Sequence, residues 1–118
     1  MKRIMLCGKI HRATVTQTDL NYEGSLGIDG ALLDAAGLLP FEKVHIYNVS
    51  NGERFSTYLI REKENSGTVA VYGAAAHKAR VKDILILVSY AVVDEEEIPF
   101  FKPKILILDD KNRIASVK

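Results

Sequence analysis

The fold of this chain is decided by residues 44–60, which read VHIYNVSNGERFSTYLI. Two runs rich in β-branched and aromatic residues, 44–49 and 54–60, flank the polar segment 50–53. Asn51-Gly52 between two such runs is a strong hairpin signal, because a type I′ turn needs two residues that tolerate positive φ. The stretch therefore predicts two antiparallel strands joined by a tight turn.

The same alternation of short strands and turn residues continues outward from this hairpin. Its pattern predicts a helix over residues 31–36, which Asp29 caps and which Gly37 ends in a left-handed conformation. The pattern also predicts a central strand at 84–90, since that run is apolar on both faces, and further strands at 4–16, 68–72 and 105–108. A chain that is mainly β with one or two short helices indicates a small barrel or sandwich. We expect Asp94–Pro103 to wrap the outside of the barrel or to reach a neighbouring subunit.

Length and composition limit the possible functions. The chain has 118 residues, enough for the single domain 1–118 with a modest core. Its formal net charge is +1, from 16 basic and 15 acidic residues, which argues against nucleic acid or an anionic membrane as a partner. Cys7 is the only cysteine, so the chain has no internal disulfide, and this fits a cytoplasmic location. The three histidines lack metal-ligand spacing, and we expect no metal site.

Three motifs give a more specific indication. They are Tyr22-Glu23-Gly24-Ser25, the segment 52–58, and Gly-Ala-Ala-Ala-His at 73–77. A Gly-Ser pair alone indicates only a turn. Together, over roughly residues 1–90, the motifs resemble the pyruvoyl-dependent aspartate decarboxylase family. The resemblance implies a double-psi β-barrel, assembled as a homotetramer with sites between subunits.

The resemblance also implies that the chain makes its own cofactor. The Ser25 hydroxyl would attack the Gly24 carbonyl, and glycine suits this position because it admits unusual backbone angles. Elimination would then leave fragments 1–24 and 25–118, the second beginning with a dehydroalanine at position 25, which hydrolyses to a pyruvoyl group. An amino acid forms a Schiff base with such a ketone, which accepts electrons as carbon dioxide departs. The implied reaction converts L-aspartate to β-alanine and carbon dioxide, for pantothenate and coenzyme A synthesis.

Two adjacent residues receive different tasks from the resemblance. Thr57 would polarise the Gly24 carbonyl before cleavage and later contact substrate. Tyr58 would donate the proton to the carbon that has lost carbon dioxide, because a phenol keeps its proton at neutral pH. Neighbouring side chains on a strand face opposite sides. Either a twist or bulge reconciles the two roles, or the residues act on opposite sides of a subunit interface.

Three cations are candidates for binding the substrate. Arg54 resembles the family's carboxylate clamp, since a guanidinium grips a carboxylate through two parallel hydrogen bonds. Lys9 and His11 share one face of the first strand at a spacing of two and could add positive potential for a dianion. Without the resemblance, all three would be interpreted as solvated strand residues.

The segment Gly73, Ala74 and Ala75 is expected to form a tight turn that presents backbone N–H groups to the substrate. Tyr72, which precedes it, departs from the family pattern, where an asparagine is frequent. Tyrosine can donate one hydrogen bond but not the two of an amide. The sequence leaves the role of Tyr72 open.

Two alternatives stay open from the sequence. One is a non-catalytic small β-barrel, a binding or regulatory module for DNA or a partner protein, although the near-neutral charge argues against DNA. The other is a pyruvoyl decarboxylase for a different small amino acid, although Arg54 and Lys9 favour an acidic substrate. The sequence also leaves open whether cleavage is spontaneous or needs a maturation factor.

Overall fold

The computed structural model describes residues Met1 to Lys118. It is mainly β, with one α-helix and two short 3-10 helices, as the sequence predicts. The elements in chain order are β1 (Lys2–Thr14), β2 (Gln17–Asp19), β3 (Leu26–Asp29), α1 (Gly30–Ala36), β4 (Lys43–Asn48), β5 (Arg54–Glu62), β6 (Val69–Tyr72), η1 (Gly73–His77), β7 (Ile84–Asp94), η2 (Ile98–Phe100), β8 (Lys104–Leu108) and β9 (Ile114–Val117).

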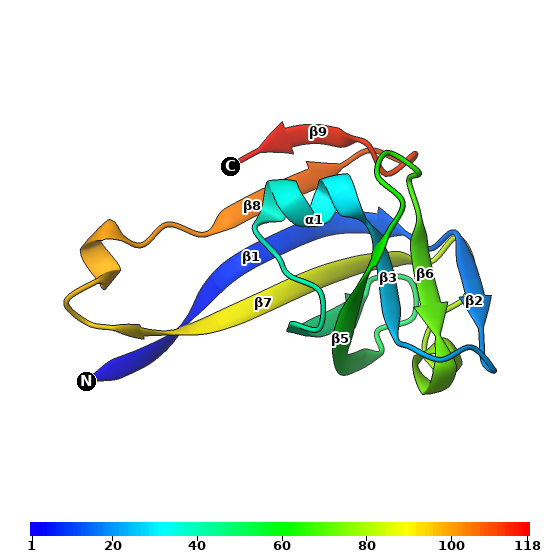
Figure 1. Cartoon of the computed structure of the whole chain (residues 1–118), viewed down its shortest axis with the longest axis horizontal. Coiled ribbons are helices and arrows are strands. Elements are labelled where there is room, and N and C mark those ends of the chain that lie inside the picture. The colour runs from blue at the N-terminus through cyan, green and yellow to red at the C-terminus, as the bar shows by residue number, and fades with distance from the viewer.

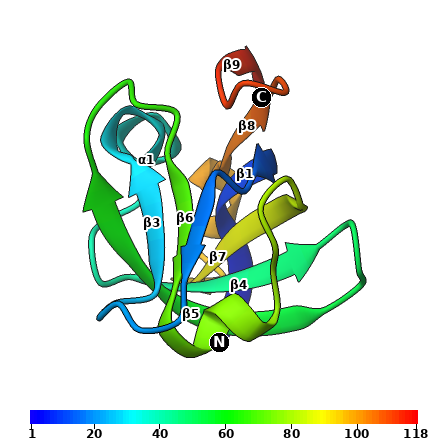
Figure 2. The same cartoon turned by 90° about the vertical axis from the view of Figure 1, so that its right-hand side faces the viewer.

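The strands form one sheet in the order β2-β6-β3-β5-β4-β7-β1-β8-β9. The pairs β1–β8, β2–β6 and β3–β5 are parallel, and the others are antiparallel. Strands β1 and β2 lie far apart in this order, yet only residues 15 and 16 separate them in the chain. The sheet therefore curls into a small barrel, seen end-on in Figure 2. This mixture of parallel and antiparallel pairs is compatible with the double-psi barrel that the resemblance implies.

The hairpin of β4 and β5 forms as predicted, but its turn is not type I′. Only Gly52 has positive φ (78°), whereas Asn51 does not. The reason is Asn48, whose side-chain oxygen accepts hydrogen bonds from the backbone N–H groups of Ser50 (2.9 Å) and Asn51 (3.4 Å). These bonds satisfy the backbone of a longer loop, so the tight two-residue turn is not needed.

Helix α1 begins and ends where the sequence predicts. The Asp29 side chain accepts a hydrogen bond from the Ala31 N–H (2.9 Å), and Gly37 ends the helix at φ 70°. The buried Asp29 carboxylate also accepts from the N–H groups of Asn65 (2.8 Å) and Gly67 (2.9 Å). One carboxylate thus fixes both the helix start and the 63–67 loop. No helix of the chain is long and apolar enough to cross a membrane.

The core lies inside the barrel and comprises 19 buried residues. Strand alternation produces it: on β4, Val44 and Ile46 are fully buried, while His45 and Tyr47, which alternate with them, are half-buried and face outward. Strand β7 is central, as predicted, because β4 and β1 pair with its two edges. The inward residues of largest volume are Ile10, Leu26, Ile28, Leu33, Ile46, Leu59, Leu85, Leu87 and Leu106.

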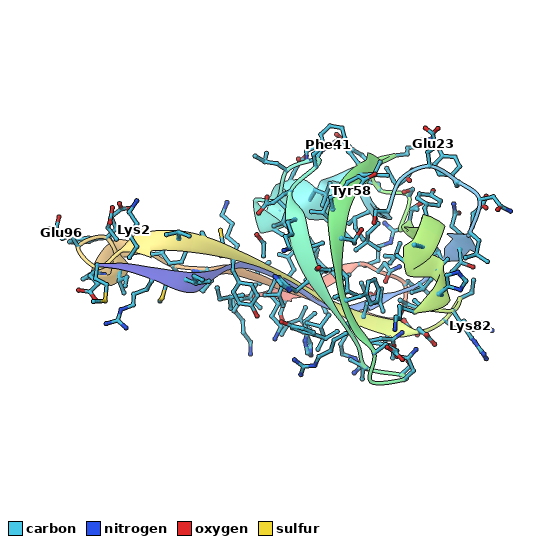
Figure 3. The ribbon with its side chains drawn as sticks, turned by 90° about the horizontal axis from the view of Figure 1, so that it is seen from below. Lys2, Glu23, Phe41, Tyr58, Lys82 and Glu96 are labelled. Carbon is cyan, nitrogen blue, oxygen red and sulfur yellow. The ribbon has the colours of Figure 1, made fainter.

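The segment Asp94–Pro103 does not wrap the barrel, so that expectation is wrong. It forms the tip of an arm made by the outer halves of β1 and β7, which extends away from the body (Figures 1 and 3). Pairing of Lys2 with Asp94 and the Arg3–Glu95 ion pair (2.9 Å) hold the arm together. Because β7 continues to Asp94 rather than ending at residue 90, the segment is carried out of reach of the barrel wall. Contact with a neighbouring subunit stays a prediction.

Candidate active site

The Gly24-Ser25 peptide lies in the loop between β2 and β3, directly before the first residue of β3. Gly24 has φ 118°, a conformation that L side chains rarely adopt. A Cβ built on Gly24 would lie 2.3 Å from Cδ1 of Ile60, so a side chain there would require Ile60 to move. Ser25 is buried, and its carbonyl accepts a hydrogen bond from the Tyr72 N–H (2.7 Å). The loop therefore holds one peptide in an unusual and closely packed conformation.

A cavity of about 300 Å³ opens beside this peptide. Its walls come from the loop between β2 and β3, from β5, and from β6 with η1. The Ser25 hydroxyl makes no hydrogen bond within the chain. The lining residues are Gly24, Ser25, Phe55, Ser56, Thr57, Tyr72, Ala74, Ala75 and Lys78. The cavity thus collects Gly24, Ser25, Thr57, Ala74 and Ala75 from the residues that the sequence proposes.

The Gly73 segment contacts the peptide bond directly. The tight turn expected here is the short 3-10 helix η1, with Gly73 at φ 64°. A Cβ on Gly73 would lie 3.1 Å from the Gly24 carbonyl oxygen, so glycine lets the two backbones approach closely. The first N–H groups of a helix have no partner within it. Those of Gly73, Ala74 and Ala75 are donors next to the cavity.

Thr57 and Tyr58 point in opposite directions, as strand geometry requires. Thr57 lines the Ser25 cavity, whereas Tyr58 is 41% exposed and packs against Phe41, with ring centroids 6.4 Å apart (Figure 3). The β4–β5 ladder runs without a bulge through both residues, which excludes a bulge as the explanation. No hydrogen bond joins the Thr57 hydroxyl to the Gly24 carbonyl in this structure, so that role stays a prediction.

Arg54 lies outside the Ser25 cavity, in an adjoining hollow of about 330 Å³. Its guanidinium lies over the Tyr47 ring, with Cζ 4.6 Å from the centroid. Phe55 and Ser56 line both this hollow and the Ser25 cavity. Ser56 and Thr57 also line a third hollow, of about 270 Å³, with Tyr58. Residues at the start of β5 therefore line all three hollows. Within a single chain, however, neither Arg54 nor Tyr58 lines the cavity that contains Ser25.

Lys9 and His11 share one face of β1, as predicted, and that face is the outside of the barrel. Ile10 between them is fully buried, so both side chains point outward. Paired residues form a row across the sheet from Arg54 through Tyr47 and Ile86 to His11. We call the residues on this side the outer face: Arg54, Ser56, Tyr47, His45, Ile86, Lys9 and His11.

His11 differs from the other two cations. Its Nδ1 is buried without a hydrogen-bond partner. Burial, followed by the positive charge of Lys9, lowers the pKa of His11 below its usual value of 6.5. The imidazole is therefore mainly neutral at pH 7, so it adds little to the positive potential that the sequence assigns to it.

Sequence reasoning missed Lys78, which is the single charged residue lining the Ser25 cavity. Its ammonium bonds to Glu53 (3.0 Å), and its carbonyl accepts from the side chains of Asn48 (3.1 Å) and Asn51 (3.0 Å). Lys78 directly follows the Gly73–His77 motif, and this position is the one feature of the sequence that could have identified it. Tyr72 was noticed in the sequence, but its contacts with the loop were not foreseeable.

The fold and the site are those of a small β-barrel that has a cavity of about 300 Å³ beside the buried Ser25. The family model for aspartate decarboxylase matches residues 1–115. Proteins named aspartate 1-decarboxylase are similar over all of this chain: 57% identity in Ralstonia nicotianae (98% of that protein), 54% in Cupriavidus necator (98%) and 50% in Bordetella pertussis (97%). This chain belongs to the aspartate decarboxylase family.

Proposed function

We propose that this protein decarboxylates L-aspartate to β-alanine after cleaving its own chain at Gly24-Ser25. The observation that carries the proposal is the Gly24-Ser25 peptide itself, held with Gly24 at φ 118° in the wall of a cavity. The relatives' name, aspartate 1-decarboxylase, supports the same reaction and substrate.

The cleavage step uses groups that already lie together. The Ser25 oxygen attacks the Gly24 carbonyl carbon, the C–N bond breaks, and the hydroxyl proton passes to the released nitrogen. The result is an ester, from which β-elimination releases a fragment ending in the Gly24 carboxylate and leaves dehydroalanine at position 25. Water then hydrolyses the dehydroalanine, releases its nitrogen as ammonia and leaves the pyruvoyl group. Glycine admits the positive φ at position 24, so the loop can hold the peptide in a conformation that most residues would disfavour. The Thr57 hydroxyl and the N–H groups of η1, from residues of the same cavity wall, would stabilise the developing charge on the Gly24 oxygen.

The residues around Ser25 fit a pyruvoyl group formed from it. The group would need no binding site of its own, because it replaces the Ser25 side chain at the cavity wall. Ala74 and Ala75 have small side chains, which leave the cavity open toward Ser25. Such a ketone supplies an electron sink for the decarboxylation of an amino acid.

The chain's own residues would bind and protonate the substrate. Arg54 is the proposed carboxylate clamp, and Lys9 adds positive charge on the outer face. Tyr58 is the proposed proton donor to the carbon that loses carbon dioxide. Because none of these three lines the Ser25 cavity of its own chain, the proposal includes a homotetramer in which a neighbour completes each site. We place the enzyme in the cytoplasm, where β-alanine serves pantothenate synthesis.

Intact mass spectrometry of the purified chain tests this function. Wild type should separate into fragments 1–24 and 25–118, and the processed protein should release carbon dioxide from aspartate. Ser25→Ala should stay whole and inactive, because it has no hydroxyl to attack. A wild-type chain that stays whole on long incubation, even with a lysate that could supply a maturation factor, would favour a non-catalytic barrel. Cleavage of Ser25→Ala at the same bond would indicate an outside protease.

A further inference from the structure

Tyr72 contacts the cleavage loop at several points. Its backbone N–H donates to the Ser25 carbonyl (2.7 Å). Its ring packs on the ring of Tyr22, with centroids 4.5 Å apart and planes at 38°. Its Cδ2 would lie 3.8 Å from a Cβ on Gly24. Tyr72 therefore holds residues on both sides of the Gly24-Ser25 bond.

The Tyr72 hydroxyl is itself held by two side chains. It donates to Oε1 of Glu62 (2.9 Å) and accepts from Nε2 of Gln17 (3.1 Å). These residues lie on three strands, β5, β2 and β6. Burial, followed by the hydrogen bond to Glu62, raises the pKa of Tyr72 above its usual value, so the phenol stays a donor to the carboxylate. The hydroxyl is thus engaged as both donor and acceptor, which fixes the ring.

Gly27 makes the Glu62 contact possible. Strand β3 lies between β5 and β6, so the Glu62 side chain must cross β3 to reach Tyr72. A Cβ on Gly27 would lie 2.3 Å from Oε1 of Glu62, which would push the carboxylate away. The glycine leaves the space through which Glu62 reaches the phenol.

We propose that Tyr72, tethered by Glu62 and Gln17, is a positioning residue for self-cleavage. It restricts Tyr22–Ser25 to the conformation from which the Ser25 hydroxyl attacks, and it takes no part in the bond changes itself. A glycine-containing loop has large conformational freedom when released, so holding it raises the fraction of attack-ready molecules. This inference rests on the proposed self-cleavage.

The test measures the cleavage rate of freshly purified uncleaved chain by intact mass. Tyr72→Phe keeps the ring on Tyr22 and removes the tether, and Glu62→Leu removes the same hydrogen bond from its other end. Glu62→Leu should slow cleavage about 5- to 10-fold, the usual effect of one hydrogen bond, and Tyr72→Phe, which also loses the Gln17 bond, should slow it at least as much. The double variant should be no slower than Tyr72→Phe alone, because that change already removes the Glu62 hydrogen bond. Glu62→Gln keeps an acceptor oxygen and should cleave at nearly the wild-type rate.

Tyr90→Phe is the matched control. It removes a hydroxyl that bonds to another tyrosine, Tyr47 (2.9 Å), away from the loop. It should leave the cleavage rate unchanged. Melting temperatures, recorded for all variants, separate positioning from general destabilisation. A purely structural tyrosine would show rates that follow melting temperature, with no rescue by Glu62→Gln.

The outcomes separate this inference from the proposed function. If wild type never cleaves, self-cleavage itself is refuted. If wild type cleaves and both Tyr72→Phe and Glu62→Leu match it, Tyr72 is not a positioning residue and the function stands. If the double variant is slowed by the product of the two single effects, Tyr72 and Glu62 act independently, and the proposed tether is refuted. If Glu62→Leu fails to fold, Gln17→Ala replaces it in the same double-variant comparison.

Discussion

The backbone conformation of Gly24 favours glycine. Its φ of 118° is unfavourable for any L side chain, and a Cβ there would also require the Ile60 side chain, whose Cδ1 lies 2.3 Å from that position, to move. Gly24→Ala should therefore shift the loop and slow cleavage by about 10-fold or more, given a cost of 1–2 kcal/mol for the backbone alone. Intact mass against time measures this rate.

Gly52 provides the control for Gly24. It also has positive φ (78°), but nothing lies within 4 Å of its Cβ position. Gly52→Ala should lower the melting temperature slightly through backbone strain and leave the cleavage rate unchanged. Equal cleavage rates in Gly24→Ala and wild type would show that the observed loop conformation is not needed for attack.

Thr57 and Tyr58 should give opposite results when each loses its hydroxyl. Thr57→Val keeps the side-chain shape, removes a donor from the Ser25 cavity, and should accumulate uncleaved chain. Tyr58 lies outside that cavity, so the Tyr58→Phe variant should cleave normally. It should decarboxylate aspartate on the order of 10²–10⁴-fold more slowly. Mass spectrometry and a carbon dioxide assay on each variant measure the two effects. Normal cleavage of Thr57→Val with failed cleavage of Tyr58→Phe would reverse the assignments.

At the scale of elements, the sequence predicted those features that depend on residues close together in the chain. The β4–β5 hairpin, α1 with its Asp29 cap, and the alternation of Thr57 and Tyr58 all follow from nearest-neighbour rules. The turn type did not, because the Asn48 side chain replaces backbone partners. Strands β2, β3 and β9 were missed, because each has only three or four residues. Those of β2 and β9 are all exposed, and those of β3 are all buried, so none shows the alternation that predicts a strand.

Asn48 connects the hairpin loop to the segment behind η1. It is 2% exposed, and its Nδ2 donates to the Lys78 carbonyl (3.1 Å) and to Asp83 (2.9 Å). Asn48→Ala removes these two bonds from a buried position, together with those that Asn48 Oδ1 accepts from the Ser50 and Asn51 N–H groups, and should lower the free energy of unfolding by roughly 2–4 kcal/mol. Denaturant titration of the uncleaved Ser25→Ala background measures the change without interference from processing.

Asn51 is the control for this prediction, because its Nδ2 donates to the same carbonyl (3.0 Å) from an exposed position. Water can replace that bond, so Asn51→Ala should cost less than about 1 kcal/mol. Equal losses in the two variants would mean that burial of Asn48 is not what makes its contacts matter.

At the scale of the whole molecule, the proposed site divides between two surfaces. Ser25, Thr57, Ala74 and Ala75 share one cavity, while Arg54, Lys9 and His11 lie on the outer face. The family resemblance identified these residues from the sequence, and strand alternation predicted that Thr57 and Tyr58 face opposite sides. Neither the resemblance nor the alternation could predict which of the other residues lie on which surface, because that depends on how β5, β4, β7 and β1 curl around the core.

If a neighbouring subunit supplies Arg54, two inactive chains should restore each other. Arg54→Ala alone should still cleave but lose activity tens- to hundreds-fold, the effect of one charge-assisted contact of about 2–3 kcal/mol. Co-expressed with Ser25→Ala in equal amounts, it should recover about one quarter of the wild-type sites, since each such site needs Ser25 from one variant and Arg54 from the other.

The control pair is Ser25→Ala with Thr57→Val, which should recover nothing, because these residues line one cavity of the same chain. Carbon dioxide release, with native mass spectrometry to confirm mixed tetramers, decides the matter. Mixed tetramers no more active than Arg54→Ala alone would place Arg54 in its own subunit's site or outside the site altogether.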